Sequence, residues 1–255
     1  IALAGMTITG TSVSNASINI SAGVGTGAGQ VNLAANSTIN LTGILQINGN
    51  TSNLTQASAT DGVVLFGNIT ANNSSSNISG RSNGGAGVRV ASGNLTFSGN
   101  ITGSSNTGVG VNIAGGNQTL SDQAIVNGQS NSASGVLFFA GNTILSGNTT
   151  VFGASNGSFG VNFTNGTQVF NTTAGSSINI TGFSNLAAGI FVNTSAVTAF
   201  TNNGSGNLNI YGSSNASAGV NISNSGALIN SGSGNLSVIG VTNAAASAGI
   251  VFVGA

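Results

Sequence analysis

Residues 126–138 read Val-Asn-Gly-Gln-Ser-Asn-Ser-Ala-Ser-Gly-Val-Leu-Phe, and this pattern recurs along a chain of 255 residues. It consists of an alternating stretch, a Gly-x-Ser/Thr-Asn tetrad, a small residue, and Gly-Val or Gly-Ile. The tetrads begin at Gly80, Gly103, Gly128, Gly153, Gly182, Gly212 and Gly240. Successive tetrad glycines are 23, 25, 25, 29, 30 and 28 residues apart. A period in this range indicates an array of one repeated structural unit.

Two strands flank each tetrad. Two residues before the glycine there is always a β-branched aliphatic residue, whereas the next position is mixed, so the first position is predicted to face inward. This core column consists of Ile78, Ile101, Val126, Val151, Ile180, Ile210 and Val238. In the strand after the tetrad, the predicted inward pairs are Val88/Val90, Val109/Val111, Val136/Phe138, Val161/Phe163, Ile190/Val192, Val220/Ile222 and Ile250/Phe252. Residues 62–65 look like an earlier copy of this second strand.

A third, less regular strand is expected in the rest of each repeat, at residues 95–97, 143–145, 168–170 and 227–229. Three strands in 23–30 residues predict an all-β fold, a three-sided parallel β-helix (β-solenoid) of about nine coils. We interpret residues 1–255 as a single β-solenoid segment, regular over 61–255 and with degenerate repeats over 1–60. Within the degenerate part, strands are expected at 7–9, 17–20, 31–33, 39–41 and 45–47. Only Gly49 to Asn53 resembles a tetrad there, with one extra residue. Because neither end carries a polar cap, the segment is expected to be a fragment of a longer fibre.

The tetrad is predicted to form a corner of the coil. Its glycine would supply a positive φ where the chain leaves the strand, and its asparagine tolerates the left-handed region. Asparagines at one corner of successive coils could donate side-chain hydrogen bonds from coil to coil, as in cross-β stacks. The predicted corner ladder is Asn83, Asn106, Asn131, Asn156, Asn185, Asn215 and Asn243. The alternative is that these side chains bind a ligand; the structural interpretation is favoured because a ligand site seldom repeats at every rung.

Composition excludes several classes of function. The charged residues are Asp61, Arg81, Arg89 and Asp122, and the chain has no Lys, Glu, His, Cys, Pro or Trp. Two distant carboxylates, with no histidine or cysteine, leave no constellation for acid–base or nucleophilic catalysis. We therefore predict no enzyme activity, no cofactor and no metal site. A net charge of zero argues against nucleic-acid binding, and no apolar run is long enough for a membrane-spanning helix.

Three smaller features remain open. Arg81 and Arg89 are expected to share a surface patch with Asp61, as a solvated pair. Asn-x-Ser/Thr triplets are frequent, and glycosylation of some is a hypothesis; examples begin at Asn40, Asn94, Asn100 and Asn179. Some outward positions of the second strand are apolar and could pack solenoids side by side, namely Val64, Leu137, Phe191 and Val251.

The repeats resemble a known family. Units such as Ser233-Gly-Asn-Leu-Ser-Val-Ile-Gly240, followed by Asn243 and Ala248-Gly-Ile250, are similar to repeats of filamentous-haemagglutinin-like adhesins. That group includes the high-molecular-weight adhesins exported by two-partner secretion. The resemblance covers roughly residues 60–255. It implies a right-handed β-helix, a location outside the bacterial cell or on its surface, and adhesion to cells or surfaces.

These observations lead to one principal expectation. The chain is expected to be a non-enzymatic extracellular structural fibre, either the stalk segment of a bacterial surface adhesin or the body of a filament. Its partners would be a continuation or further copies of the same solenoid, with a host-cell, glycan or surface target reached through another region. The alternative is a self-assembling filament or sheath subunit that polymerises through its open ends. An ice- or glycan-binding face would need a flat array of Thr or aromatic residues, and the outward columns are too mixed for that.

Overall fold

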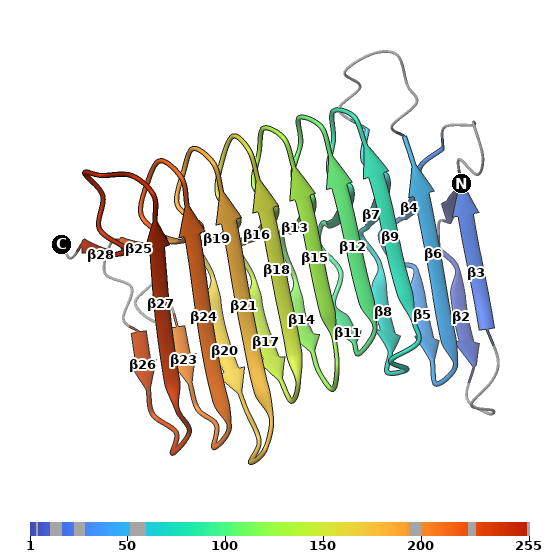
Figure 1. The fold of residues 1–255 in the computed structure, drawn as a ribbon. Coiled ribbons are helices and arrows are strands. Elements are labelled where there is room, and N and C mark those ends of the chain that lie inside the picture. The colour runs from blue at the N-terminus through green and yellow to red at the C-terminus, as the bar shows by residue number, and fades with distance from the viewer. Residues whose placement is uncertain are drawn as a thin grey trace.

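A computed structural model describes residues 1–3, 5–10, 17–22, 29–51, 60–193, 200–223 and 228–253. These residues form an all-β solenoid of three parallel sheets, without a helix (Figure 1). Consecutive strands of the chain pass from sheet to sheet, and each strand pairs with the strand three positions along the chain. The prediction of a three-sided parallel β-solenoid is confirmed. The part of the chain described here contains no helix that could cross a membrane.

The three sheets are named A, B and C, and their strands follow in stacking order. Sheet A contains β1 (Ala2–Leu3), β4 (Val31–Leu33), β7 (Val63–Leu65), β10 (Val88–Val90), β13 (Val111–Ile113), β16 (Val136–Phe139), β19 (Val161–Thr164), β22 (Ile190–Asn193), β25 (Val220–Ser223) and β28 (Ile250–Val253). Sheet B contains β2 (Thr7–Gly10), β5 (Thr38–Leu41), β8 (Asn68–Ala71), β11 (Leu95–Phe97), β14 (Asn117–Leu120), β17 (Asn142–Ser146), β20 (Thr167–Asn171), β23 (Phe200–Asn202) and β26 (Leu228–Asn230). Sheet C contains β3 (Ser17–Ala22), β6 (Ile44–Asn50), β9 (Asn77–Ser82), β12 (Asn100–Ser105), β15 (Ile125–Ser130), β18 (Thr149–Ser155), β21 (Ser177–Ser184), β24 (Asn207–Ser214) and β27 (Leu236–Thr242).

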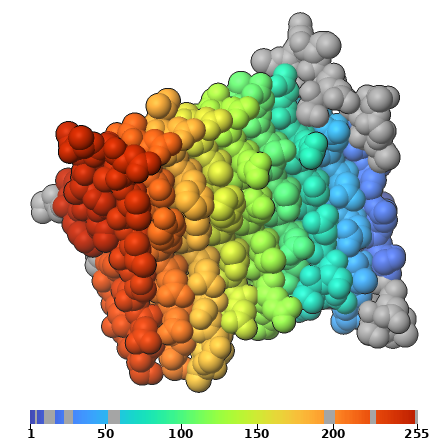
Figure 2. Space-filling model, viewed as in Figure 1, coloured from blue at the N-terminus to red at the C-terminus, as the bar shows by residue number. Residues whose placement is uncertain are grey.

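The coil is right-handed. In Figure 1 the chain runs up the sheet C strands at the front and crosses the upper loops to the sheets behind. It then returns below to the next sheet C strand, while the coils advance from right to left. Parallel strands joined by a crossover adopt this hand almost without exception. Figure 2 shows the coils as successive bands that follow one another without a break.

Equivalent residues of successive coils stand in vertical files. Gly103 is paired with Gly80 on one side and with Gly128 on the other. The same register holds where the repeat is longer, since Gly153 is paired with Gly182. The extra residues of this longer repeat lie in the loop before sheet C. Two residues, 147–148, separate β17 from β18, whereas five residues, 172–176, separate β20 from β21. Corner loops therefore absorb the variation in repeat length, and the strands stay in register.

The core is mainly aliphatic, with buried phenylalanines and a few buried polar side chains such as Gln118 and Gln168, and it fills the space enclosed by the three sheets. Six members of the predicted core column are at most 3% exposed, and the seventh, Val238 in the last sheet C strand, is partly buried. Phe138 and Phe163 stack inside the coil with ring centroids 4.7 Å apart. Full burial of one such side chain contributes about 1.5–3 kcal/mol. Stacking the repeats thus buries a column that no single coil could cover.

One detail of the predicted second strand was wrong. In the coil that begins at β12, the inward pair is Val111/Ile113 and not Val109/Val111, because Val88 is paired with Val111. This coil contains two Gly-Val dipeptides, and the second of them starts the strand. Val64 does lie in the outward file, paired with Arg89, but it is covered there and only 3% exposed.

The degenerate part of the chain follows the same register. Gly49 is paired with Gly80 and Asn50 with Arg81. The tetrad of this coil therefore starts at Gly49 without an extra residue, and Thr51 takes the Ser/Thr position. Asn53, which the sequence suggested as the end of this tetrad, lies outside the described residues, as does Ala227 of the expected third strand at 227–229.

Candidate functional site

The corner between sheets C and A contains two facing files of glycine. The tetrad glycines lie inside the sheet C strands, and none has a positive φ, so the predicted conformational reason for them was wrong. A Cβ on Gly128 would lie 2.0 Å from the carbonyl oxygen of Gly135, the glycine that precedes sheet A. The other six tetrad glycines face the same obstacle at 1.9–2.1 Å. Glycine is required here because two backbones pass in direct contact.

The third position of the tetrad forms a hydroxyl relay. The Ser155 hydroxyl donates to the carbonyl oxygen of Ala133 in the preceding coil at 2.6 Å and accepts from the Ser158 N–H at 2.9 Å. The same pair of bonds is made by Ser82, Ser105, Ser130, Ser184 and Ser214, and Thr242 differs only in accepting from the N–H two residues on, at Ala244, instead of three. We call these seven residues the serine relay. The relay provides hydrogen-bond partners for N–H and carbonyl groups of the turn that would otherwise be buried without one. The sequence has Ser or Thr at this position in every tetrad, but the repeat pattern alone does not indicate the bonding partners.

The seven corner asparagines form one hydrogen-bonded file, the asparagine ladder. Each amide nitrogen donates to the amide oxygen of the asparagine one coil before it. The donor–acceptor distances, from the Asn106–Asn83 step to the Asn243–Asn215 step, are 3.1, 2.9, 3.0, 2.7, 2.7 and 2.7 Å. None of the seven has a positive φ, so the expected use of the left-handed region was wrong. The ladder, and not backbone conformation, accounts for asparagine at this position.

A shallow groove of about 650 Å³ runs along the outside of this corner. One bank is formed by five ladder asparagines, from Asn106 to Asn215, and the relay serines contribute to the lining between the banks. The other bank is the file of second tetrad residues, namely Arg81, Ser104, Gln129, Ala154, Phe183 and Ser213. We call it the tetrad groove. It crosses six coils, or roughly 24 Å at about 4.8 Å per rung.

An aromatic cluster lies at the C-terminal half of this groove. Phe183, which lines the groove, is 39% exposed. Its ring is tilted against Phe152 of the preceding coil, with centroids 5.6 Å apart, and against Tyr211 of the following coil at 5.9 Å. Edge-to-face and tilted pairs at this separation are mutually stabilising. The cluster therefore holds an apolar surface in place beside a row of amides.

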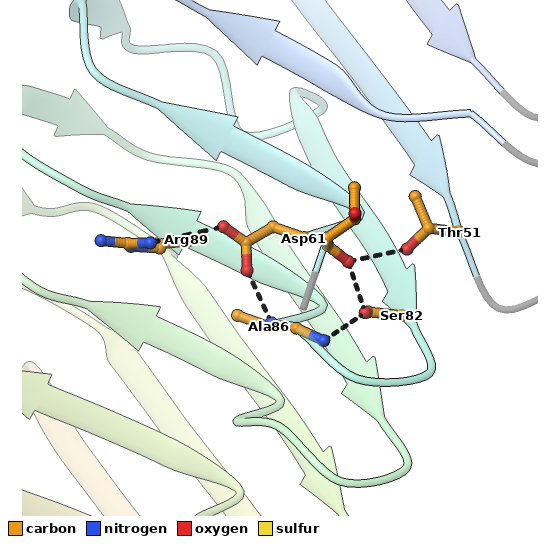
Figure 3. Close-up of polar contacts among 7 residues, drawn as sticks. Thr51, Asp61, Ser82, Ala86 and Arg89 are labelled. Atoms are coloured by element: carbon orange, nitrogen blue, oxygen red, sulfur yellow. Dashed lines mark hydrogen bonds and ion pairs between the residues drawn. The ribbon is translucent and has the colours of Figure 1, made fainter. Parts of the chain in front are cut away.

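Asp61, Arg81 and Arg89 lie at the opposite, N-terminal end of the described regular coils, and Figure 3 shows Asp61 and Arg89. Asp61 accepts a hydrogen bond from the Ala86 N–H at 2.7 Å, and its other oxygen lies 3.6 Å from Arg89 Nη1. The carboxylate side chain is 11% exposed and that of Arg89 is 43% exposed. The expected pairing with Arg89 is present, but Asp61 is buried and not solvated. Arg81 instead lies at the end of the tetrad groove.

The surroundings of Asp61 favour its neutral form. Burial raises the pKa of this carboxyl above its ordinary value, and the Ala86 hydrogen bond and the charge of Arg89 only partly oppose the effect. Thr51 and Ser82 both donate to the carbonyl oxygen of Thr60, one residue before Asp61 (Figure 3). Asp61 therefore belongs to the corner itself, and its carboxylate serves as a backbone acceptor there.

The predicted site residues fall into two places. The structure brings the seven corner asparagines together in a file on the outside of the corner, and the core column together in the interior. The groove, the serine relay and the aromatic cluster were not found from the sequence. The sequence does contain a pattern that indicates the aromatic cluster. Three successive repeats have an aromatic residue at an outward position beside the tetrad glycine, namely Phe152, Phe183 and Tyr211.

Comparisons with known proteins add no further assignment. No protein-family model, no curated protein and no solved structure matches the chain.

Proposed function

We propose that the chain is a stretch of a non-enzymatic extracellular fibre, the stalk of a bacterial surface adhesin or the body of a filament. The observation that carries the proposal is the register, since equivalent residues of successive coils pair in all three sheets. Sheets of nine and ten parallel strands make a rod roughly 40 Å long at about 4.8 Å per rung. Such a rod can hold a binding part away from a cell surface.

The composition supports the same function. The whole chain offers trypsin-like proteases only two basic residues, and one of them, Arg89, lies within β10 and is paired with Asp61. Exposed surface proteins benefit from such resistance. The resemblance of the repeats to filamentous-haemagglutinin-like adhesins supports a cell-surface location and a role in attachment.

The location can be tested on intact source cells. Antibodies raised against the chain should place immunogold particles on material projecting from the cell surface in electron micrographs. Cells that lack the coding sequence are the control for specificity. Labelling that appears only after the cells are permeabilised would contradict an extracellular fibre.

A subunit that polymerises end to end is the second candidate, since the register that joins equivalent coils within one copy could continue into the next copy. Sedimentation velocity distinguishes the candidates: a subunit should form longer particles as its concentration rises. Particles of one length at all concentrations would contradict polymerisation.

A further inference from the structure

The tetrad groove has a regular array of unused hydrogen-bonding groups. A primary amide has two N–H donors and two acceptor lone pairs on its oxygen. Each inner asparagine of the ladder uses one donor and one acceptor along the ladder, as Asn156 does with Asn131 and Asn185. One N–H and one lone pair of each exposed amide therefore remain for water or a ligand. They recur at every coil, at about 4.8 Å spacing.

The lining of the groove is almost free of charge. Of the side chains that line it, only Arg81 is ionised, and it lies at the N-terminal end. A polyanion such as nucleic acid would find no row of cations to replace its counterions. The partners that suit the groove are neutral molecules whose groups both donate and accept hydrogen bonds, as hydroxyl groups do.

The exposed ring of Phe183 adds an apolar contact within the same groove. It lies between Phe152 and Tyr211 and is fixed by both. Sugar rings combine hydroxyl groups at their edges with C–H groups on their faces, so they match a row of amides beside a fixed aromatic ring. Concave sites that combine apolar walls with a few oriented polar groups are the usual form of ligand sites.

We propose that the tetrad groove binds a neutral, linear polysaccharide laid parallel to the solenoid axis. A site that repeats at every rung is unusual for a small ligand, but it suits a ligand that is itself a repeating chain. The amides of Asn131, Asn156 and Asn185 would exchange hydrogen bonds with sugar hydroxyls, and Phe183 would pack against a ring face. The proposal concerns a groove at the corner, which differs from the flat face that the sequence disfavours.

The proposal is tested with the purified chain by affinity electrophoresis. Gels contain one of several neutral polysaccharides (β-glucan, α-glucan, mannan, xylan or galactan), or dextran sulfate as a charged comparison. At least one neutral polysaccharide should retard the chain, and linear oligosaccharides should compete better as they lengthen, up to a span of roughly 24 Å. The proposal would be overturned if only dextran sulfate retarded the chain, or if no polysaccharide did. It would also be overturned if a monosaccharide competed as strongly as the longer oligosaccharides.

Variants locate the site without disturbing the fold. Phe183→Ser places in the groove the residue that Ser104 and Ser213 already provide in the same file, and it should weaken binding about tenfold. Phe139→Ser is the matched control, since Phe139 is 45% exposed at the end of β16 and does not line the groove. Equal retardation of the two variants would overturn the site assignment.

A second pair of variants tests the groove by blocking it. Ala154→Arg introduces a long side chain that the same file already carries at Arg81, and it should abolish retardation, whereas Ala154→Ser should retain it. Binding that survives Ala154→Arg would contradict the proposal. These tests use the isolated chain, so their outcome is independent of where the protein is located in the cell.

Discussion

At the scale of single residues, contact between two backbones decides which positions must be glycine. The tetrad glycines have ordinary negative φ values, and it is the missing side chain that matters. Gly128→Ala would place a methyl group against the carbonyl of Gly135, inside a corner that cannot open without breaking the register. We expect the free energy of unfolding to fall by about 3 kcal/mol or more, measured by denaturant titration.

The neighbouring outward residue provides the control for this prediction. Gln129→Ala changes an exposed side chain and should alter stability by no more than about 0.5 kcal/mol. If Gly128→Ala were as mild as Gln129→Ala, the close approach of the two strands would be refuted.

The corner between sheets A and B places residues in the left-handed region. Ala140 has a φ of 60° and is followed by Gly141 at 78°, and one coil later Asn165 and Gly166 have 62° and 78°. Alanine is strained in this region by about 1–2 kcal/mol, whereas asparagine is tolerated. Ala140→Asn should therefore raise the free energy of unfolding by about 1 kcal/mol, and Asn165→Ala should lower it. Thermal melts check the prediction. Shifts of the melting temperature in opposite directions for the two variants support the account, and shifts in the same direction contradict it.

The buried carboxyl of Asp61 gives the protein a pH dependence of known sign. Because its pKa is raised in the folded state, the folded protein binds this proton more tightly than the unfolded chain does. Its contribution to stability is complete below the pKa of the unfolded chain and is lost as the pH rises through the folded pKa. Asp61→Asn should remove this decline and be at least as stable as the parent at neutral pH, since the partly exposed pair with Arg89 contributes little.

Denaturation midpoints measured from pH 3 to pH 7 test the prediction. Asp122→Asn is the control and should leave the decline unchanged. A parent protein whose stability rises over this range, or a decline that survives in Asp61→Asn, would show that burial does not govern this carboxyl.

At the scale of the structural element, each tetrad contributes two hydrogen-bonded files with different burial. Asn156→Ala removes two bonds of an exposed ladder and should cost about 1–2 kcal/mol. Ser155→Ala leaves the Ser158 N–H and the Ala133 carbonyl without their hydroxyl partner in a buried position, so it should cost about 2–3 kcal/mol. Chemical denaturation of both variants checks the order. A larger loss in Asn156→Ala would contradict the role assigned to the serine relay.

The elements show why parts of the structure could be predicted from the sequence. Strand alternation allows only one choice of inward face, so a column of β-branched residues at fixed distance from a glycine predicts the core. An asparagine at the same place in every repeat predicts a file, because parallel in-register stacking superposes equal positions. The repeat length predicts the number of sheets, because 23–30 residues are enough for three short strands and the three corners that join them.

Other parts could not be predicted, for physical reasons. The role of Gly128 depends on which atom lies opposite its Cα, and that atom belongs to another strand. The role of Ser155 is not evident from the sequence because serine is common throughout this chain, so its repetition carries little information. Val109 and Val111 both follow a glycine, so the Gly-Val dipeptide does not distinguish which of them starts the strand. The interval of four residues between the ladder asparagine and the second glycine, present in six of the seven repeats, would have decided between them.

At the scale of the whole molecule, the distance between two residues along the rod depends on the number of coils between them and not on the number of residues. Ser104, Ser213 and Val241 occupy one outward file, and four register steps separate the first two although the repeats differ in length. The rise per step is about 4.8 Å in every repeat. A rod built in this way keeps its length when loops at the corners grow or shrink, which suits a stalk.

Pulsed electron paramagnetic resonance on pairs of spin labels tests this claim most directly, and the chain has no native cysteine to interfere. Three double-cysteine variants carry the labels, at positions Ser104 and Ser213, at Ser104 and Val241, and at Arg81 and Val241. The two labels of each pair are four, five and six coils apart, respectively. The account predicts narrow distributions that increase by about 4.8 Å per coil, near 19, 24 and 29 Å between the backbones. Broad distributions, or distances that do not increase from one pair to the next, would contradict the stacked solenoid.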